Sequence, residues 1–311
     1  GVDGMCDTSD DQLMLAHAGD DAGTAATPLA YGIVTALYDG NGLITGFLTR
    51  ELVSGQYELH RRDATLNPVS VLTALDVRQG NVEALRAGSG QVFLALIPAG
   101  GPDNNSDGTL DTQLYRYDVG AGSLTSLYTY ATNPGTDNCF LCSARYDASD
   151  LYFIGDDTLM RVPRASGSTP SPIDAGVSSL ELTTVKVVYV KSDASVYVYD
   201  KGADTTFEML EAPPPGDPHE TREVHYADAS GIVFVNAKFI NSDGNLSGIG
   251  SYVFDEDDAP QSPLMLGDSL FVGSVRGTTF SLDTETQPAP RRVIRTTYYS
   301  DGEDVEDVSD A

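Results

Sequence analysis

The sequence predicts an all-β fold in which one structural unit repeats along the chain. Short apolar runs that contain an aromatic residue recur through the 311 residues, and turn-forming residues separate them, including 31 glycines and 16 prolines. Two loops of matching sequence, at 105–111 and 241–247, each precede a strand that ends in Tyr-x-aromatic-Asp. Short strands that repeat at a period of tens of residues are typical of a β-propeller. We therefore predict a propeller of about six blades.

The predicted strands follow one another as hairpins. The first clear strand, 29–38, leads into the hairpin turn 39–42. Six pairs of strands then follow: 43–49 with 56–62, 92–97 with 114–117, 151–155 with 158–162, 187–191 with 196–199, 232–237 with 251–254, and 270–273 with 278–282. The blade count becomes seven if the runs 12–16 and 291–299 close the ring together. A pair of β-sandwiches is the alternative fold.

The repeat spans residues 29–295 and resembles bacterial β-propeller domains in architecture, without matching one family. Its units lack the Gly-His and Trp-Asp pairs of WD40 blades, and the chain contains no Trp. The resemblance implies a fold and no activity, because propellers host unrelated functions. We expect residues 1–28 to form an acidic N-terminal segment and linker, and residues 296–311 to form an acidic C-terminal tail.

The charge balance excludes several classes of partner. The chain has 46 Asp and Glu against 18 Lys and Arg, which gives a net charge of −28. Nucleic acids and anionic lipid surfaces would be repelled, and no apolar run reaches the roughly 20 residues that a membrane-spanning helix needs. An acidic surface favours solubility and cation binding. We expect an extracytoplasmic protein, periplasmic, cell-surface or secreted, that begins as a mature or trimmed product.

The loop 101–112 carries the clearest chemical pattern. Side-chain oxygens recur at alternate positions, and Gly108 allows a sharp turn. The candidate calcium ligands are Asp103, Asn105, Asp107, the Thr109 carbonyl and Asp111. The order Asp-x-Asn-x-Asp-Gly-x-x-Asp is similar to the calcium loops of integrin-type propeller repeats and of dockerins, which implies a structural Ca²⁺. It departs from an EF-hand because Leu114 stands where that motif has a bidentate Glu. The alternative is an Asx-rich turn without metal.

The second copy of the loop, at 241–247, has lost two of these positions. Phe239 and Ser247 stand where the first loop has Asp103 and Asp111. Two missing carboxylates should remove most of the affinity for Ca²⁺. We therefore predict a structural hairpin at this copy.

Two cysteines, Cys139 and Cys142, form a Cys-x-x-Cys pair. A thioredoxin-like motif would need a βαβ context, and a haem-attachment motif would need His in place of Ser143. The remaining interpretations are a short-loop disulfide, which we favour for an exported protein, or buried or free thiols. Cys6 is then left over.

Aspartates end one strand in most units, at Asp63, Asp118, Asp200, Asp255 and Asp283. They could form a ring of carboxylates at one end of a propeller. The favoured alternative is a turn-starting Asp whose side chain accepts hydrogen bonds from nearby backbone N–H groups, since turn-type residues follow each one.

No catalytic constellation is predicted. The four histidines form no metal-binding spacing, and no nucleophile elbow occurs. We expect a non-enzymatic, exported, calcium-stabilised propeller that binds an unidentified protein or carbohydrate ligand or associates with itself. The alternatives are a hydrolase or lyase acting on a polysaccharide or phosphate ester in a central channel, and a purely structural surface or filament component.

Overall fold

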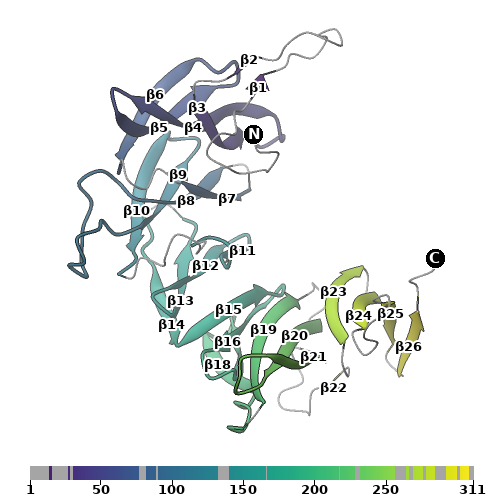
Figure 1. Cartoon of the computed structure of the whole chain (residues 1–311). Coiled ribbons are helices and arrows are strands. Elements are labelled where there is room, and N and C mark those ends of the chain that lie inside the picture. The colour runs from purple at the N-terminus through teal and green to yellow at the C-terminus, as the bar shows by residue number, and fades with distance from the viewer. Residues whose placement is uncertain are drawn as a thin grey trace. The chain divides into compact units, whose positions relative to one another are not determined.

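The computed structural model describes most of the chain between residues 31 and 255 and shorter stretches outside it (Figure 1). The described residues are 14–15, 27–28, 31–76, 82–88, 90–131, 140–165, 167–216, 218–227, 232–255, 264–265, 269–275, 278–283, 292–299 and 302–307. All regular elements among them are β-strands. Over these stretches there is no helix long and apolar enough to cross a membrane. Contacts divide the chain into two compact units, residues 1–142 and 143–311.

The first unit contains a short strand pair and two four-stranded antiparallel sheets. β1 (Met14–Leu15) pairs with β2 (Thr27–Pro28). The first sheet runs in the order β3 (Tyr31–Tyr38), β4 (Ile44–Val53), β5 (Gln56–Asp63) and β6 (Pro68–Leu75). The second sheet runs β7 (Glu83–Ala87), β8 (Gln91–Leu96), β9 (Gln113–Asp118) and β10 (Ser123–Thr129).

The second unit contains four sheets of the same design. The third sheet is β11 (Arg145–Tyr146), β12 (Asp150–Gly155), β13 (Thr158–Pro163) and β14 (Ser171–Ala175). The fourth is β15 (Val177–Leu182), β16 (Lys186–Lys191), β17 (Val196–Asp200) and β18 (Thr205–Leu210). The fifth is β19 (His219–Ala227), β20 (Ile232–Ile240), β21 (Leu246–Asp255) and β22 (Leu264–Met265). The sixth is β23 (Ser269–Val275), β24 (Thr278–Asp283), β25 (Arg292–Tyr299) and β26 (Gly302–Asp307).

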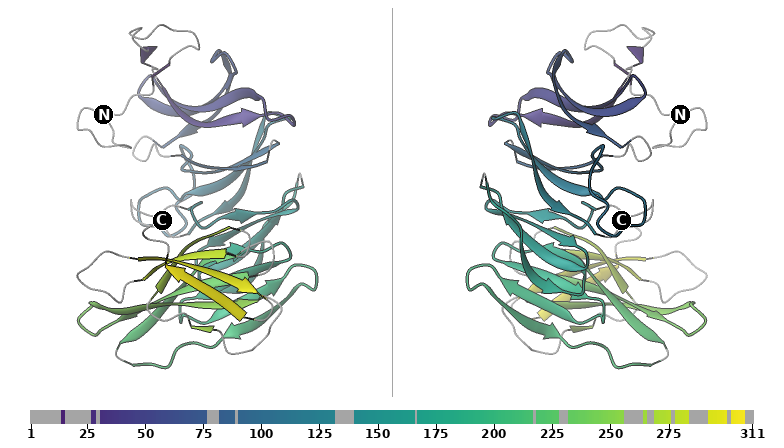
Figure 2. Two further views of the ribbon diagram at one scale, coloured as in Figure 1. Left: turned by 90° about the vertical axis from the view of Figure 1, so that its right-hand side faces the viewer. Right: turned by 90° about the vertical axis from the view of Figure 1, so that its left-hand side faces the viewer.

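The structure confirms the predicted fold class. Each of the six four-stranded sheets is an antiparallel meander in chain order, which is the blade unit of a β-propeller. Figure 2 shows the strands from two further sides, coloured by residue number. All six predicted strand pairs are hydrogen-bonded neighbours.

Three details bear on the predicted ends of the repeat. The pair 270–273 with 278–282 joins the first and second strands of its sheet, and not the second and third as in the other five. β25, in the run proposed to complete a seventh blade, is the third strand of the sixth sheet. The predicted boundary at residue 295 therefore falls inside a strand, and the proposed domain limits stay predictions.

The cores lie between consecutive sheets of a unit. In the first unit, Leu48 and Leu59 of the first sheet pack with Val92 and Leu94 of the second. In the second unit, β16 contributes to two cores at once. Val187 and Tyr189 pack with residues of the third sheet, whereas Val188 and Val190 pack with residues of the fifth. Alternate residues of a strand point to opposite faces, so a strand covered on both faces carries a continuous apolar run, here residues 187–190.

Charged pairs connect the third and fourth sheets around this core. Lys201 Nζ lies 2.9 Å from Asp147 Oδ2, and Lys191 Nζ lies 2.9 Å from Asp174 Oδ2. Burial works to raise the pKa of Asp174, but hydrogen bonds from Lys191 and Tyr189 outweigh it and hold the pKa below its ordinary 3.8. Burial also works to raise the pKa of Asp147. The hydrogen bond from Lys201 is the main effect that opposes burial, and the pKa of Asp147 is lowered as well.

We expect acid to weaken the second unit through these pairs. Both carboxylates have pKa values lowered from 3.8 in the folded chain. Their stabilising effect is therefore present above that value and is lost as the pH falls through the folded pKa. Asp174→Asn should cost about 1 kcal/mol at neutral pH and flatten the loss of stability between about pH 5 and pH 3.

Urea unfolding across this pH range measures the effect. Asp157→Asn, at an exposed carboxylate in the β12–β13 turn, is the matched control and should leave the profile unchanged. Equal profiles for the two variants would contradict the assignment.

Candidate functional site

The candidate calcium loop joins β8 to β9 in the second sheet. Its two ends are closed by backbone hydrogen bonds, since Asp111 N–H donates to Pro102 O at 2.7 Å. Its root also pairs with the end of β6 in the first sheet. Leu75 and Pro98 form an antiparallel bridge, and Asp76 N–H donates to Ile97 O at 2.9 Å. The loop therefore rests on both sheets of its unit.

Side chains at the tip of the loop turn towards its own backbone. Asp103 Oδ1 accepts from Asp107 N–H and Oδ2 from Gly108 N–H, both at 3.1 Å. Asp107 Oδ1 accepts from the Thr109 N–H at 2.8 Å and from the Thr109 hydroxyl. These two Thr109 donors, the hydroxyl first, lower the pKa of Asp107. Asn105 Nδ2 donates to Asp107 Oδ2 at 3.0 Å. The tip is thus an ordered turn around Asp107.

Asp111 is the buried member of the predicted ligand set. Its side chain is 0% exposed, and its Oδ2 accepts from Asn104 N–H at 2.8 Å. Its Oδ1 is buried and has no hydrogen-bond partner within the structure. A buried carboxylate oxygen without a partner carries the full cost of desolvation, and a bound cation is one group that would offset it. This orphaned atom fits the predicted Ca²⁺.

The arrangement also fits the metal-free alternative in one respect. Across the described stretches of the chain, no three His, Cys, Asp or Glu side chains gather closely enough to hold a metal ion. The hydrogen bonds of Asp103 and Asp107 are those of an Asx-rich turn. The calcium site, including the Thr109 carbonyl, therefore stays a prediction.

The second copy of the loop is a tight hairpin between β20 and β21, as predicted. Asn241 N–H donates to Asn245 O at 2.9 Å, and Gly244 N–H donates to Asn241 O at 2.8 Å. The hydroxyl of Ser247 donates to Phe239 O at 3.0 Å. The two residues that replace carboxylates are thus bonded to each other across the hairpin.

The strand-end aspartates begin turns. Asp63 Oδ1 accepts from Thr65 and Asn67 N–H groups at 2.9 Å. Asp118 Oδ1 accepts from Ala121 N–H at 2.8 Å, and Asp200 Oδ1 accepts from two turn N–H groups at 2.8 Å. These bonds confirm the turn interpretation for these three aspartates. The side chains of 255 and 283 lie outside the described residues.

The described residues do not test the predicted disulfide. Cys142 lies among the described residues, whereas Cys139 and Cys6 do not. The pairing of Cys139 with Cys142 stays a prediction.

One charged cluster was missed by the sequence analysis. His60 Nε2 lies 2.7 Å from Glu58 Oε2, and His60 Nδ1 lies 3.7 Å from Glu51 Oε1. Arg62 Nε donates to Glu51 Oε1 at 2.8 Å. Glu58, His60 and Arg62 alternate along β5, which places their side chains on one face of the strand. The cluster could have been predicted from this alternation.

Comparison with known proteins finds similar solved structures, but no similar family or curated protein. No family model matches the sequence, and no curated protein matches it. A post-proline cleaving enzyme from Rickettsia typhi is 9% identical with a TM-score of 0.48; the match covers 89% of this chain and 44% of that one, so this chain spans less than half of its length.

Two further solved structures are similar over most of their length. BamB from Moraxella catarrhalis is 13% identical with a TM-score of 0.42, over 88% of this chain and 84% of that one. The β-propeller domain of the Trilobed protease from Pyrococcus furiosus is 11% identical with a TM-score of 0.39, over 92% and 87%. At these scores the fold assignment rests on the strand order of the sheets.

The turn at Gly108 yields a test of the loop conformation. Gly108 has a φ of +84° and no atom within 4 Å of an added Cβ. We expect Gly108→Ala to destabilise the protein by about 1–2 kcal/mol, because a left-handed backbone is strained for any residue with a Cβ. Gly40→Ala, in a turn without a left-handed φ and with the same open space, is the control. Equal losses in denaturant unfolding would contradict this description of the turn.

Proposed function

We propose that this chain is a non-enzymatic, extracytoplasmic β-propeller protein whose loop between β8 and β9 binds a structural Ca²⁺. In this proposal the stabilised sheets present their loops to a protein or carbohydrate partner, or to further copies of the chain. The observation that carries the calcium step is the buried, unpartnered Oδ1 of Asp111. Calcium takes oxygen ligands from carboxylates, amides and backbone carbonyls, and these are the groups that the loop supplies.

The other loop residues retain capacity for a cation. A carboxylate has about four lone-pair sites on its two oxygens. Asp103 uses two of them for backbone N–H groups, and Asp107 Oδ2 receives a hydrogen bond from Asn105. Backbone N–H groups that hold a carboxylate in place also orient its remaining lone pairs. The metal-free hydrogen bonds are therefore compatible with a bound ion.

The charge of the chain supports the same proposal. At a net charge of −28, divalent cations are concentrated near the surface, and a bound Ca²⁺ relieves repulsion between carboxylates. Extracellular modules bind Ca²⁺ with dissociation constants on the order of 10⁻⁴–10⁻³ M. A weak, exposed loop site of this kind would be filled outside the cytoplasm, which is the basis for the proposed location.

We also propose the disulfide between Cys139 and Cys142, because the Cys-x-x-Cys spacing suits a short disulfide loop in an exported protein. Intact mass before and after alkylation without reductant counts the free thiols, and a peptide map of the alkylated chain shows which cysteine carries the label. We expect one cysteine to be labelled in the native chain and three after reduction, because the chain contains three cysteines. Labelling of all three without reductant would rule the disulfide out.

Calcium should raise the thermal stability of the chelator-treated protein. A ligand at 100 times its dissociation constant stabilises by about 2.7 kcal/mol, which corresponds to a rise in Tm of roughly 4 °C for a chain of 311 residues that unfolds as one. Asp111→Asn and Asp107→Ala should each remove most of this rise, because each deletes a charged ligand. Differential scanning fluorimetry across a calcium titration measures it.

Two controls separate a specific site from charge screening. Asp243→Asn changes the second copy of the loop and should keep the full rise, and Mg²⁺ at equal ionic strength should give little of it. If the Tm of the unmodified protein is the same with calcium and with chelator, the loop is an ordinary turn.

A further inference from the structure

The loop between β8 and β9 is fastened to the first sheet at its root, residues 97–99. The root meets residues 74–76, at the end of β6. Leu75 and Pro98 form the antiparallel bridge, and the residue pairs on either side of the bridge are each joined by a backbone hydrogen bond, of 2.9 Å and 3.0 Å. Among the described strands, β6 is otherwise paired with β5 alone. The end of β6 therefore depends on the loop for its attachment to the second sheet.

The root is also bonded to the part of the loop that carries Asp111. Gly101 N–H donates to Pro98 O at 3.1 Å, and Asp111 N–H donates to Pro102 O at 2.7 Å. An added Cβ at Gly101 would lie 2.9 Å from Pro98 Cγ and 3.1 Å from Pro98 O, so the turn is closely packed. Two backbone hydrogen bonds and one tight turn thus connect the candidate calcium ligand with the attachment of β6.

The closed loop carries an electrostatic cost when no cation is bound. Asp111 is fully buried, and its Oδ1 has no hydrogen-bond partner within the structure. Such an oxygen bears the cost of desolvation, and Asp103 and Asp107 add two further negative charges to the loop. Opening of the loop lets water reach Asp111 and relieves this cost. A bound Ca²⁺ offsets the cost without any opening, so it favours the closed arrangement.

The strand held by the root has little else to keep it in place. Val69 and Val71 of β6 are 53% and 56% exposed. The ladder between β6 and β5 is interrupted by two bulges, and a bulge leaves one residue unpaired. Leu75, by contrast, is 1% exposed and packs in the core between the two sheets. Detachment of the root would therefore uncover Leu75 and lengthen the exposed apolar part of β6.

We propose that Ca²⁺ bound in this loop is a clamp between the first and second sheets, and that its removal releases the end of β6. The inference rests on the calcium site proposed above. Because binding and attachment are linked, each strengthens the other by the same factor. The calcium concentration then sets how much of an apolar edge strand is exposed, and exposed edge strands are surfaces that strands of other chains can join.

A thiol introduced beneath the root measures the attachment. Leu75→Cys places it in the core, where reaction with 5,5′-dithiobis(2-nitrobenzoate) requires local opening. Leu48→Cys is the control, because Leu48 is 0% exposed in the same core and lies on β4, away from the root. The measured quantity is the ratio of the two reaction rates, each corrected for the cysteines of the unmodified chain. We expect this ratio to be about tenfold higher with chelator than with calcium.

A second variant tests the same link from the side of the metal. Ala99→Pro deletes the N–H that donates to Ala74 O and changes no candidate ligand. By reciprocity it should weaken Ca²⁺ binding about fivefold or more, as measured by isothermal titration calorimetry on the full chain. Ala121→Pro is the matched control. Ala121 is also an exposed alanine whose N–H is bonded within the second sheet, to Asp118 Oδ1, and its replacement should leave the affinity unchanged.

The outcomes separate the clamp from the calcium site. No binding of Ca²⁺ to the unmodified protein would remove the site and the clamp together. Binding of Ca²⁺ with the same rate ratio in calcium and in chelator would leave the site in place and overturn the clamp. An affinity that is the same in Ala99→Pro as in the unmodified protein would overturn the clamp as well, and this result does not depend on the folding of Leu75→Cys.

Discussion

Burial of sheet faces against neighbouring sheets is the constraint on which this structure depends. A four-stranded sheet with one apolar face can leave its other face in water, but β16 has Val187 and Tyr189 in one core and Val188 and Val190 in another. Such a strand is stable only between two neighbours. The repeat along the sequence and the stacking of consecutive sheets within a unit are therefore consequences of one requirement.

The scarcity of cations shapes what surrounds these cores. Only 18 Lys and Arg balance 46 Asp and Glu, and several of them join one sheet to the next. Lys201 and Lys191 of the fourth sheet pair with carboxylates of the third. Arg222 of the fifth donates to Ala194 O at 3.0 Å and to Glu211 O at 2.7 Å, next to the fourth. Each cation also offsets local repulsion, so its position matters more than in a chain of balanced charge.

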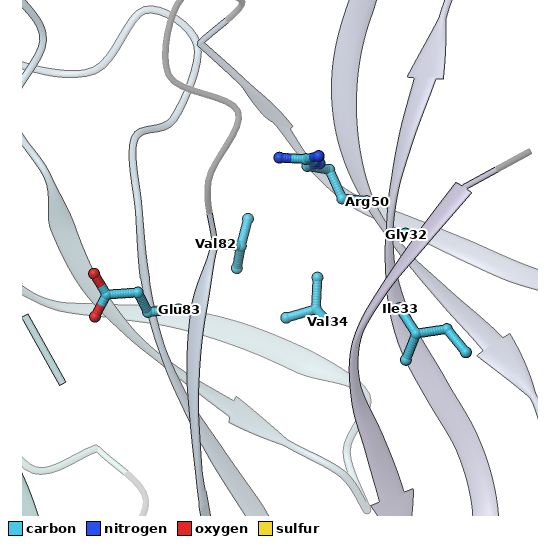
Figure 3. A pocket seen from close by; sticks show the side chains of 6 residues that line it. All are labelled: Gly32, Ile33, Val34, Arg50, Val82 and Glu83. Carbon is cyan, nitrogen blue, oxygen red and sulfur yellow. The ribbon is translucent and has the colours of Figure 1, made fainter. Parts of the chain in front are cut away.

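Local patterns in the sequence predicted the hairpins well. Strand pairs and the aspartates at Asp63, Asp118 and Asp200 depend on residues close along the chain, and the structure confirms them. The cavity lined by Gly32 and Arg50 in the first unit (Figure 3) could not be predicted in this way. The pairing of Gly32 with Arg50 depends on the register of β3, which has a bulge between Ile33 and Thr35. Because a bulge adds one residue, it reverses which side chains share a face.

The calcium loop was only partly predictable for a different reason. Its spacing identifies five candidate ligand residues, but short Asp and Asn side chains also accept hydrogen bonds from the backbone N–H groups of a turn. Sequence could not show that Asp111 is buried with one oxygen unpartnered, because that burial comes from the packing beneath the loop. The distinction between ligand and turn residue depends on tertiary structure.

The root of this loop has a consequence for how the first unit comes apart. The loop between β8 and β9 of the second sheet is bonded to β6, an edge strand of the first sheet. The contacts are the bridge between Leu75 and Pro98 and the hydrogen bond from Ala99 N–H to Ala74 O at 3.0 Å. Breaking either sheet open at this point disturbs the other. The two sheets should therefore exchange their amide hydrogens as one cooperative block rather than as separate hairpins.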